Sequence, residues 1–270
     1  MLQNLTLGQF YPAVSMIHCL DPRTKLCMCL AFMGILIWAQ SLFLFIFILT
    51  VVLIVIRISE VPMNIALNNL KAFRFLLIIT FAAHACFTPG INVIIYEITI
   101  PGLTWEGILQ GMLFCIRLIV IILIAALLML TTAPLDISDG IERLLKPFEK
   151  IGLPAHELAI MMVIALRFIP TLVEEAGRIQ KAQMSRGADF TGNPIKRLRK
   201  IASLLVPLMI SAFRRAEELA VAMEARCYRG GTGRTQYRVM ILNRNDYFAI
   251  ITTAALLVIL IFGNIFITFN

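Results

Sequence analysis

Long apolar runs separated by short polar breaks dominate the chain. A helix that crosses a bilayer needs about 20 largely apolar residues. We predict five membrane-spanning helices, at residues 25–40, 42–57, 75–95, 107–130 and 247–269. The first two form a tight helical hairpin, because only Gln40 and Ser41 interrupt their apolar run. A further apolar stretch, residues 158–166, is too short to span a membrane alone.

Composition supports a membrane protein. Of the 270 residues, 60% are hydrophobic and 15% are charged, whereas soluble domains have about 45–50% and about 25%. The six cysteines form no CxxC pair and lie mostly in apolar runs, so we interpret them as small apolar residues rather than as metal ligands. The three histidines are isolated from other ligand types, and we expect neither a metal nor a cofactor. We also expect no cleavable signal peptide, because residues 1–20 lack a basic start.

Basic residues predict which side each loop faces, since cytoplasmic loops carry an excess of Lys and Arg. The segments before the first span, after the second and after the fourth are basic, whereas residues 96–106 contain neither Lys nor Arg. A cytoplasmic N-terminus with five spans places every basic cluster inside and leaves only Arg117 within a span. The outer loop at residues 96–105 contains β-formers and a Pro-Gly pair, which predicts a short hairpin.

The chain therefore divides into residues 1–131 with four spans, a cytoplasmic domain at residues 132–246, and the last span in residues 247–270. Most of the 24 Lys and Arg residues lie in the cytoplasmic domain. They are mixed there with acidic residues, which argues against nucleic acid as a partner despite the net charge of +8.

Breaks at Gly and Pro predict three helices in this domain, at residues 137–149, 155–186 and 195–228. Pro170 lies inside the first long helix and is expected to bend or break it, and Pro207 is expected to kink the second, because proline removes a backbone hydrogen bond. On the first long helix, Glu174 and Arg178 are spaced to form an ion pair.

The second long helix presents small residues at spacing four, namely Ala212, Ala216 and Ala220. Such a stripe lets another helix approach closely.

The two long helices end alike, each in an arginine between small residues. The endings are Ala182-Gln183-Met184-Ser185-Arg186-Gly187 and Ala222-Met223-Glu224-Ala225-Arg226-Cys227. A single arginine near a helix C-terminus is explained by the helix dipole. A matched pair favours a different role, because the planar guanidinium can bind carboxylates of a partner in bidentate fashion.

Five motifs in order, on this topology, carry a resemblance to a known family. They are Leu20-Asp21-Pro22-Arg23-Thr24-Lys25-Leu26, Thr131-Thr132-Ala133-Pro134, Ala165-Leu166-Arg167-Phe168-Ile169-Pro170, the first helix ending, and Arg215-Ala216-Glu217-Glu218-Leu219-Ala220 leading into the second. Over nearly its whole length the chain resembles the transmembrane (T) component of energy-coupling factor (ECF) transporters.

The resemblance implies a non-catalytic scaffold. In that family two ATPase subunits, alike or different, dimerise beneath the T component, and the T component's two coupling helices dock on them. One or several small membrane proteins, the S components, capture the vitamin or other micronutrient. The residues that would dock on the ATPases are Ser185, Arg186, Gly187, Ala225, Arg226 and Cys227. Ser185 and Cys227 replace the Ala and Gly of the family's usual Ala-Arg-Gly motif.

Alternatives remain open at this stage. A T component dedicated to cobalt, nickel or biotin fits the same motifs, and a stand-alone carrier or channel is the rival of a different class. An enzyme is disfavoured: there is no GxxxxGK[ST] loop, and the ionisable residues inside the spans are His84 and Arg117. We interpret His84 as a packed polar residue and expect Arg117 to be held by a structural ion pair or hydrogen bond.

Overall fold

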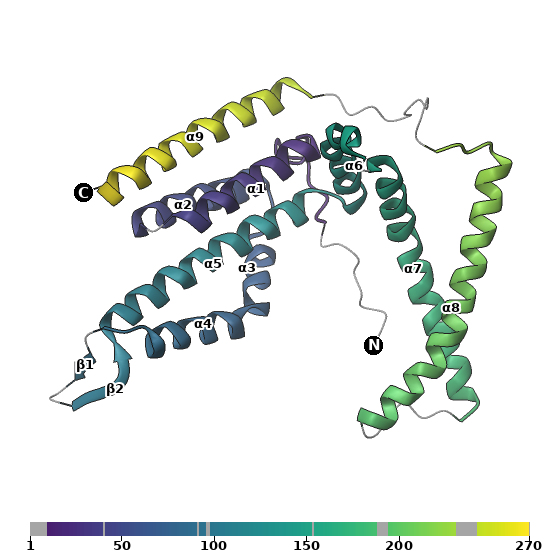
Figure 1. Ribbon diagram of the computed structural model, residues 1–270, viewed down its shortest axis with the longest axis horizontal. Helices are drawn as coiled ribbons and strands as arrows, with labels where there is room; N and C mark the ends of the chain where they lie inside the picture. The colour runs from purple at the N-terminus through teal and green to yellow at the C-terminus, as the bar shows by residue number, and fades with distance from the viewer. Residues whose placement is uncertain are drawn as a thin grey trace. The chain divides into compact units, whose positions relative to one another are not determined.

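A computed structural model describes residues 10–39, 41–90, 92–95, 98–152, 154–187, 194–230 and 242–269 (Figure 1). The chain divides into two compact units. The first comprises Gly8–Gly140 with Met240–Asn270, and we call it the span unit. The second comprises Met1–Leu7 with Ile141–Val239, and we call it the long-helix unit. Each is described by itself.

Helix α5 (Trp105–Thr131) is the centre of the span unit and contacts α1, α2, α3 and α4 (Figure 1). Its 27 residues extend about 40 Å, which exceeds the roughly 30 Å of a bilayer core. Thr104 caps its N-terminus by accepting a hydrogen bond from Gly107 N. Gly107 and Gly111 let α4 approach closely, because a Cβ at Gly111 would stand 3.2 Å from both the ring and the carbonyl oxygen of Phe81.

The two helices of the predicted hairpin are present as α1 (Pro22–Trp38) and α2 (Leu42–Ile58), each of 17 residues. Asp21 is the N-cap of α1, and its carboxylate accepts a hydrogen bond from Arg23 N at 3.0 Å. Pro22 occupies the first helical position, where its missing N–H costs nothing. Leu36, Phe45 and other apolar side chains of the pair are buried in the core that α5 completes.

The third span differs from its prediction. Residues 75–95 were expected to form one helix, but two helices, α3 (Met63–Ala72) and α4 (Arg74–Phe87), meet at a 56° bend. Helix α4 stops before Pro89-Gly90, and β1 (Asn92–Ile95) then pairs with β2 (Ile98–Thr104) in an antiparallel hairpin. The predicted hairpin is thus present but begins earlier, because the β-branched run before residue 96 joins it. Residues 96 and 97 lie outside the described part of the chain.

Arg117 lies within α5, and the structure supplies the hydrogen bond that was expected for it. Its Nη2 donates to the carbonyl oxygen of Ala39 at 2.6 Å. The guanidinium carbon also lies 5.2 Å from the ring centre of Phe45 and 4.8 Å from that of Phe114, within the range of cation–π attraction. Ala39 is the C-cap of α1, so Arg117 satisfies a carbonyl that has no helical partner.

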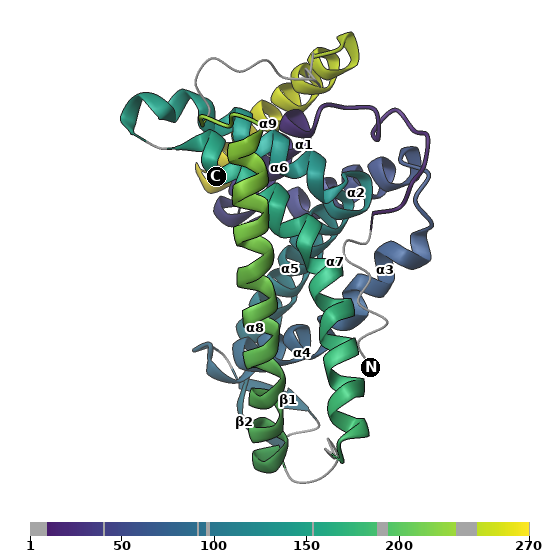
Figure 2. The ribbon, with the colours of Figure 1, turned by 90° about the vertical axis from the view of Figure 1, so that its right-hand side faces the viewer.

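In the long-helix unit, η2 (Lys146–Ile151) leads into α7 (Ala155–Ser185), which lies beside α8 (Pro194–Ala225) (Figures 1 and 2). Pro170 and Pro207 are internal, and both helices continue through them; the alternative of a break is wrong. A shorter helix, α6 (Pro134–Leu145), begins before its predicted start at 137.

Several described helices can cross a membrane by length and composition. They are α5, α7, the described part of α9 (Arg244–Phe269), and the bent pair α3–α4 taken as one span; α2 is a shorter apolar helix. Helix α7 was not predicted to be long enough to cross a membrane, because the unbroken apolar stretch ends at Leu166. The helix continues beyond this point, and Phe168, Ile169 and Leu172 extend its apolar part. With β1–β2 the only strand pair in the described ranges, the protein is an all-α polytopic membrane protein.

A buried polar junction joins the first turn of α1 to α9. Asp246 is 1% exposed. Its carboxylate accepts hydrogen bonds from Asp21 N at 2.8 Å, from Thr24 Oγ1 at 3.2 Å and from Asn243 N at 2.7 Å. The last bond is a capping box, since Asn243 precedes α9 and Asp246 is its third helical residue. One side chain thus caps α9 and attaches it to α1.

Lys25 extends the junction to the end of α5. Its Nζ donates to the carbonyl oxygen of Thr131 at 2.9 Å and to that of His18 at 3.2 Å. The His18 ring in turn bonds through Nε2 to the carbonyl of Tyr11 at 3.0 Å, which makes Nδ1 the acceptor of the Ser15 hydroxyl at 2.7 Å. Burial lowers the pKa of His18 and favours this neutral form.

Replacing Asp246 by Ala should destabilise the span unit, because the buried Asp21 N–H would lose its acceptor and Asn243 N and the Thr24 hydroxyl would each lose one bond. Each unsatisfied donor costs about 1–3 kcal/mol. Thr24→Val removes the hydroxyl that lies 3.2 Å from Asp246 Oδ1 and 2.6 Å from Asp21 O, but it leaves the two backbone bonds to Asp246 in place and serves as the graded control. The thermal unfolding midpoint in one detergent should fall in the order wild type, Thr24→Val, Asp246→Ala. Equal midpoints for Asp246→Ala and wild type would contradict the junction.

Candidate functional site: the ends of the two long helices

Both long helices end in the same backbone turn. At the end of α7, Arg186 N bonds to Gln183 O at 3.1 Å and Gly187 N to Met184 O at 3.0 Å. At the end of α8, the corresponding bonds run from Arg226 N to Met223 O at 3.1 Å and from Cys227 N to Glu224 O at 2.8 Å. The similarity of the two sequences therefore extends to their hydrogen bonding.

The residue after each arginine adopts left-handed backbone geometry. Gly187 has φ +85°, and Cys227 has φ +58°. Helices often end in this way, usually with glycine, because a Cβ is disfavoured there. Cys227 stands where the family's motif has glycine, and it takes up the same turn. The turn is thus retained at the cost of local strain.

Both arginines and their neighbours are exposed. Ser185, Arg186 and Gly187 are exposed, as are Ala225, Arg226 and Cys227. The hydroxyl of Ser185 bonds back to Lys181 O at 3.1 Å, so it stays within its own helix. Each arginine lies at a helix end between small residues, and its exposure leaves the guanidinium donors accessible to carboxylates.

A carboxylate connects α7 to α8. Glu175 Oε2 accepts from Arg178 Nη2 at 2.6 Å and from Arg215 Nη2 of α8 at 3.3 Å. The predicted partner of Arg178 was Glu174, which is wrong. Glu174 is exposed, whereas Glu175 is half-buried and lies where Arg215 also reaches it.

The small residues of α8 line a groove against α7. The groove has a volume of 320 Å³, and Ile164, Phe168 and Leu172 form its α7 wall. The α8 wall contains the predicted stripe, Ala212, Ala216 and Ala220. Ala216 and Ala220 are nevertheless exposed, so α7 does not cover the stripe fully.

Two features of the structure were not predicted from the sequence: the bridge at Glu175 and the buried carboxylate of Asp246. The bridge at Glu175 could not be predicted, because the sequence does not show which face of α7 contacts α8. Asp246 was detectable, because Asn243-x-x-Asp246 before an apolar run is a helix-start signal. His84 was interpreted correctly: its Nδ1 lies 3.0 Å from Thr80 O and its ring packs on Phe114.

Comparison with known proteins shows which family the sequence matches. Residues 13–237 match the sequence profile of the family described as CbiQ, cobalt transport protein. Among curated relatives, the energy-coupling factor transporter transmembrane protein EcfT of Acidaminococcus fermentans is 44% identical over 263 residues, covering 97% of each chain. The proteins of the same name from Thermosediminibacter oceani and Bacillus subtilis are 45% and 43% identical, covering 95% and 97% of this chain and 97% and 99% of their own.

The left-handed position can be tested at both helix ends. Gly187→Ala should destabilise its turn and Cys227→Gly should stabilise the other, because the Cβ costs about 1 kcal/mol in this conformation. Hydrogen exchange of the amides at the turns should then become about fivefold faster in Gly187→Ala and about fivefold slower in Cys227→Gly. Unchanged exchange in both variants would contradict the shared geometry.

Proposed function

This chain belongs to the family of transmembrane T components of energy-coupling factor transporters, and we propose that it couples two ATPase subunits to an S component that captures a vitamin or another micronutrient. It is a transporter subunit. ATP hydrolysis is assigned to its partners, because the sequence contains no phosphate-binding GxxxxGK[ST] loop. No cofactor and no nucleic acid is needed for this role.

The observation that carries the proposal is the pair of matched helix ends. Two exposed arginines, Arg186 and Arg226, follow helices that finish in the same left-handed turn. Two equivalent contacts of this kind suit a dimer of similar subunits. We assign one ATPase subunit to each end, with the guanidinium bound to carboxylates of the ATPase and the small neighbours allowing close approach.

An exposed apolar stripe on α8 supports a second partner. Val206, Met209, Ile210 and Phe213 recur at helical spacing and are all exposed. Apolar surface of this extent marks a protein or membrane contact. We assign it to an S component, with the small residues Ala212, Ala216 and Ala220 permitting close packing against α8.

The proposed mechanism is a lever. ATP binding closes the ATPase dimer and moves the two docked helix ends toward each other. The long helices transmit this motion to the surface that holds the S component. Pro170 and Pro207 give each helix a point where a backbone hydrogen bond is missing and bending is easier. Glu175, bonded to Arg178 and Arg215, makes α7 and α8 move together.

The proposed location is the cell membrane. The excess of Lys and Arg in residues 132–246 supports a cytoplasmic location for this coupling domain and for the N-terminus, on the side where ATP is available. The relatives are named for energy coupling rather than for a metal, so the alternative dedicated to cobalt, nickel or biotin is not favoured. Co-purification with several S components would support shared use.

Reversing both docking charges should release the ATPases. Arg186→Glu with Arg226→Glu replaces two donors by carboxylates that repel the proposed acceptors. The ATPase subunits that co-purify with the T component should fall at least about tenfold, since the loss of two charge-assisted contacts exceeds roughly 1.4 kcal/mol.

A charge-matched control separates docking from general electrostatics. Arg167→Glu with Arg214→Glu changes the net charge equally at two exposed positions away from the helix ends. This variant should retain the ATPases. Retention by both double variants would refute docking at the helix ends.

Glu175→Gln should weaken the coupling of the two helices without releasing the ATPases. The amide loses its charge-assisted bonds to Arg178 and Arg215. Transport per ATP hydrolysed should fall about two- to fivefold, in line with roughly 0.5–1 kcal/mol for a partly exposed ion pair. Glu174→Gln, which alters the exposed neighbour, is the control. Equal transport per ATP in both variants would show that Glu175 has no part in coupling.

A further inference from the structure

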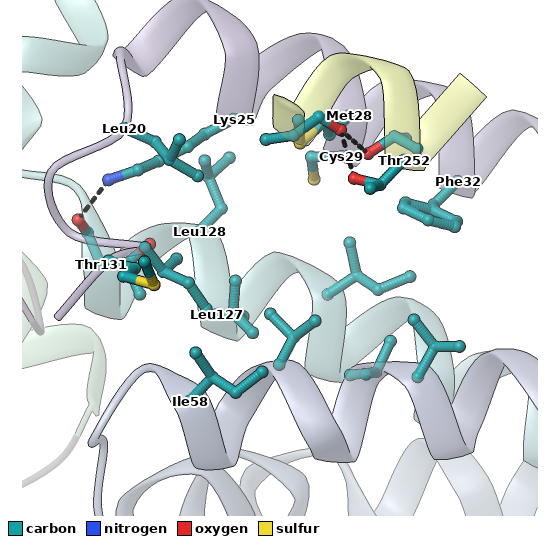
Figure 3. Close-up of a pocket in the computed structure, with 18 of the residues that line it drawn as sticks. Leu20, Lys25, Met28, Cys29, Phe32, Ile58, Leu127, Leu128, Thr131 and Thr252 are labelled. Carbon is teal, nitrogen blue, oxygen red and sulfur yellow. Dashed lines mark hydrogen bonds between the residues drawn. The ribbon is translucent and has the colours of Figure 1, made fainter. Parts of the chain in front are cut away.

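The span unit contains an apolar cavity that the proposed coupling function does not use. It has a volume of 390 Å³ and lies between α1, α2, α5 and α9 (Figure 3). This size falls in the range of about 300–1,000 Å³ that is usual for small-molecule sites. Its walls include Phe32, Val55, Leu128 and Leu256.

The charge in the cavity is confined to one end; Thr252 and Thr253 also line the cavity, but their hydroxyls bond to carbonyls of α9 itself. Lys25, Thr131 and Asn245 line it at the first turns of α1 and α9 and the last turn of α5, whereas Phe32 and Leu256 line it further along the helices. From Lys25 to Phe32 along α1 is about 10 Å, and from Asn245 to Leu256 along α9 is about 16 Å. The cavity therefore extends over about half of a bilayer core of roughly 30 Å, which is the depth of one leaflet.

Of the described residues that line the cavity, Lys25 is the one that carries a charge. Figure 3 shows its side chain directed to the carbonyl of Thr131 at this end. The two carbonyl acceptors of Thr131 and His18 use two of its N–H groups, and an ammonium has three. One donor is thus available to an anion at the polar end.

Carboxylates also lie near Lys25, namely those of Asp21, Asp136 and Asp246. None of them lines the cavity. Asp246 is occupied by three donors, and Asp21 accepts from Arg23 N and lies 3.5 Å from Arg23 Nε. Because these carboxylates lie outside the cavity, the ammonium of Lys25 is the charge that a molecule in the cavity meets.

We propose that an anionic phospholipid occupies this cavity, with one acyl chain along the apolar walls and its phosphate near Lys25. The profile of the cavity matches that of a lipid of one leaflet, and basic pockets between membrane helices recognise anionic head groups. On the topology proposed above, this is the cytoplasmic leaflet. The lipid would fill space beside the junction of α1, α5 and α9.

The test uses the complete transporter complex in nanodiscs of equal parts phosphatidylglycerol and phosphatidylcholine. After extraction into a mild detergent, mass spectrometry counts the retained molecules of each lipid. The wild type should retain phosphatidylglycerol about fivefold more than phosphatidylcholine, the preference that one lysine provides. Equal retention of the two lipids would overturn the proposal.

Filling the cavity is the second arm. Ala249 lines the cavity, whereas Ala255 on the same helix is exposed and does not. Ala249→Phe should abolish the preferential retention of phosphatidylglycerol, and Ala255→Phe should leave it unchanged. If Ala249→Phe does not fold, Val55→Phe fills the cavity from α2, with the exposed Ile54→Phe as its control. Undiminished retention in a folded cavity-filling variant would place the lipid elsewhere and overturn the proposal.

Discussion

The buried carboxylate of Asp246 is the interaction on which the span unit depends. A carboxylate that is 1% exposed is stable only when its oxygens are satisfied, because removing a charge from water costs several kcal/mol. Its donors come from the N-cap region of α9 and from the first turn of α1. Lys25, one residue after Thr24, then holds the end of α5. Apolar helices have no strong preference among one another in lipid, so this polar junction determines which helix ends meet.

The long-helix unit follows a different principle. In its described part, an ion-pair bridge at Glu175 connects α7 to α8, the groove between the two helices is incompletely filled, and several large apolar side chains of α8 are exposed. An element with few internal contacts and exposed apolar surface is built to move or to bind partners. The strained turn at Cys227 fits the same interpretation, because strain persists where a conformation is needed for contact.

Apolar run length and the positions of Gly and Pro made most of the helices predictable from the sequence. Features that depend on contacts between helices could not be predicted in this way. The hairpin of α1 and α2, the long α5 and the two long helices follow from apolar run length and from Gly and Pro breaks. The bend between α3 and α4 could not be predicted from these patterns. Met63–Ala72 is too polar to be recognised as part of a span by itself, and it becomes part of one only together with α4. Choosing Glu174 over Glu175 as the partner of Arg178 failed for a related reason: spacing along one helix does not show which carboxylate a second helix will contact. The paired arginines were identified from local sequence alone, since a helix ending is a local structure.

The proposed function depends on contact between the two helix ends and the ATPase subunits. Its most direct test is a photo-activated cross-linking amino acid placed at position 186, at position 226 and, as a control, at the exposed position 167 of the assembled complex in native membranes. The account predicts cross-links from 186 and from 226 to ATPase subunits, and none to them from 167. Cross-links from both helix ends to lipid or to an S component, with no ATPase adduct, would contradict it.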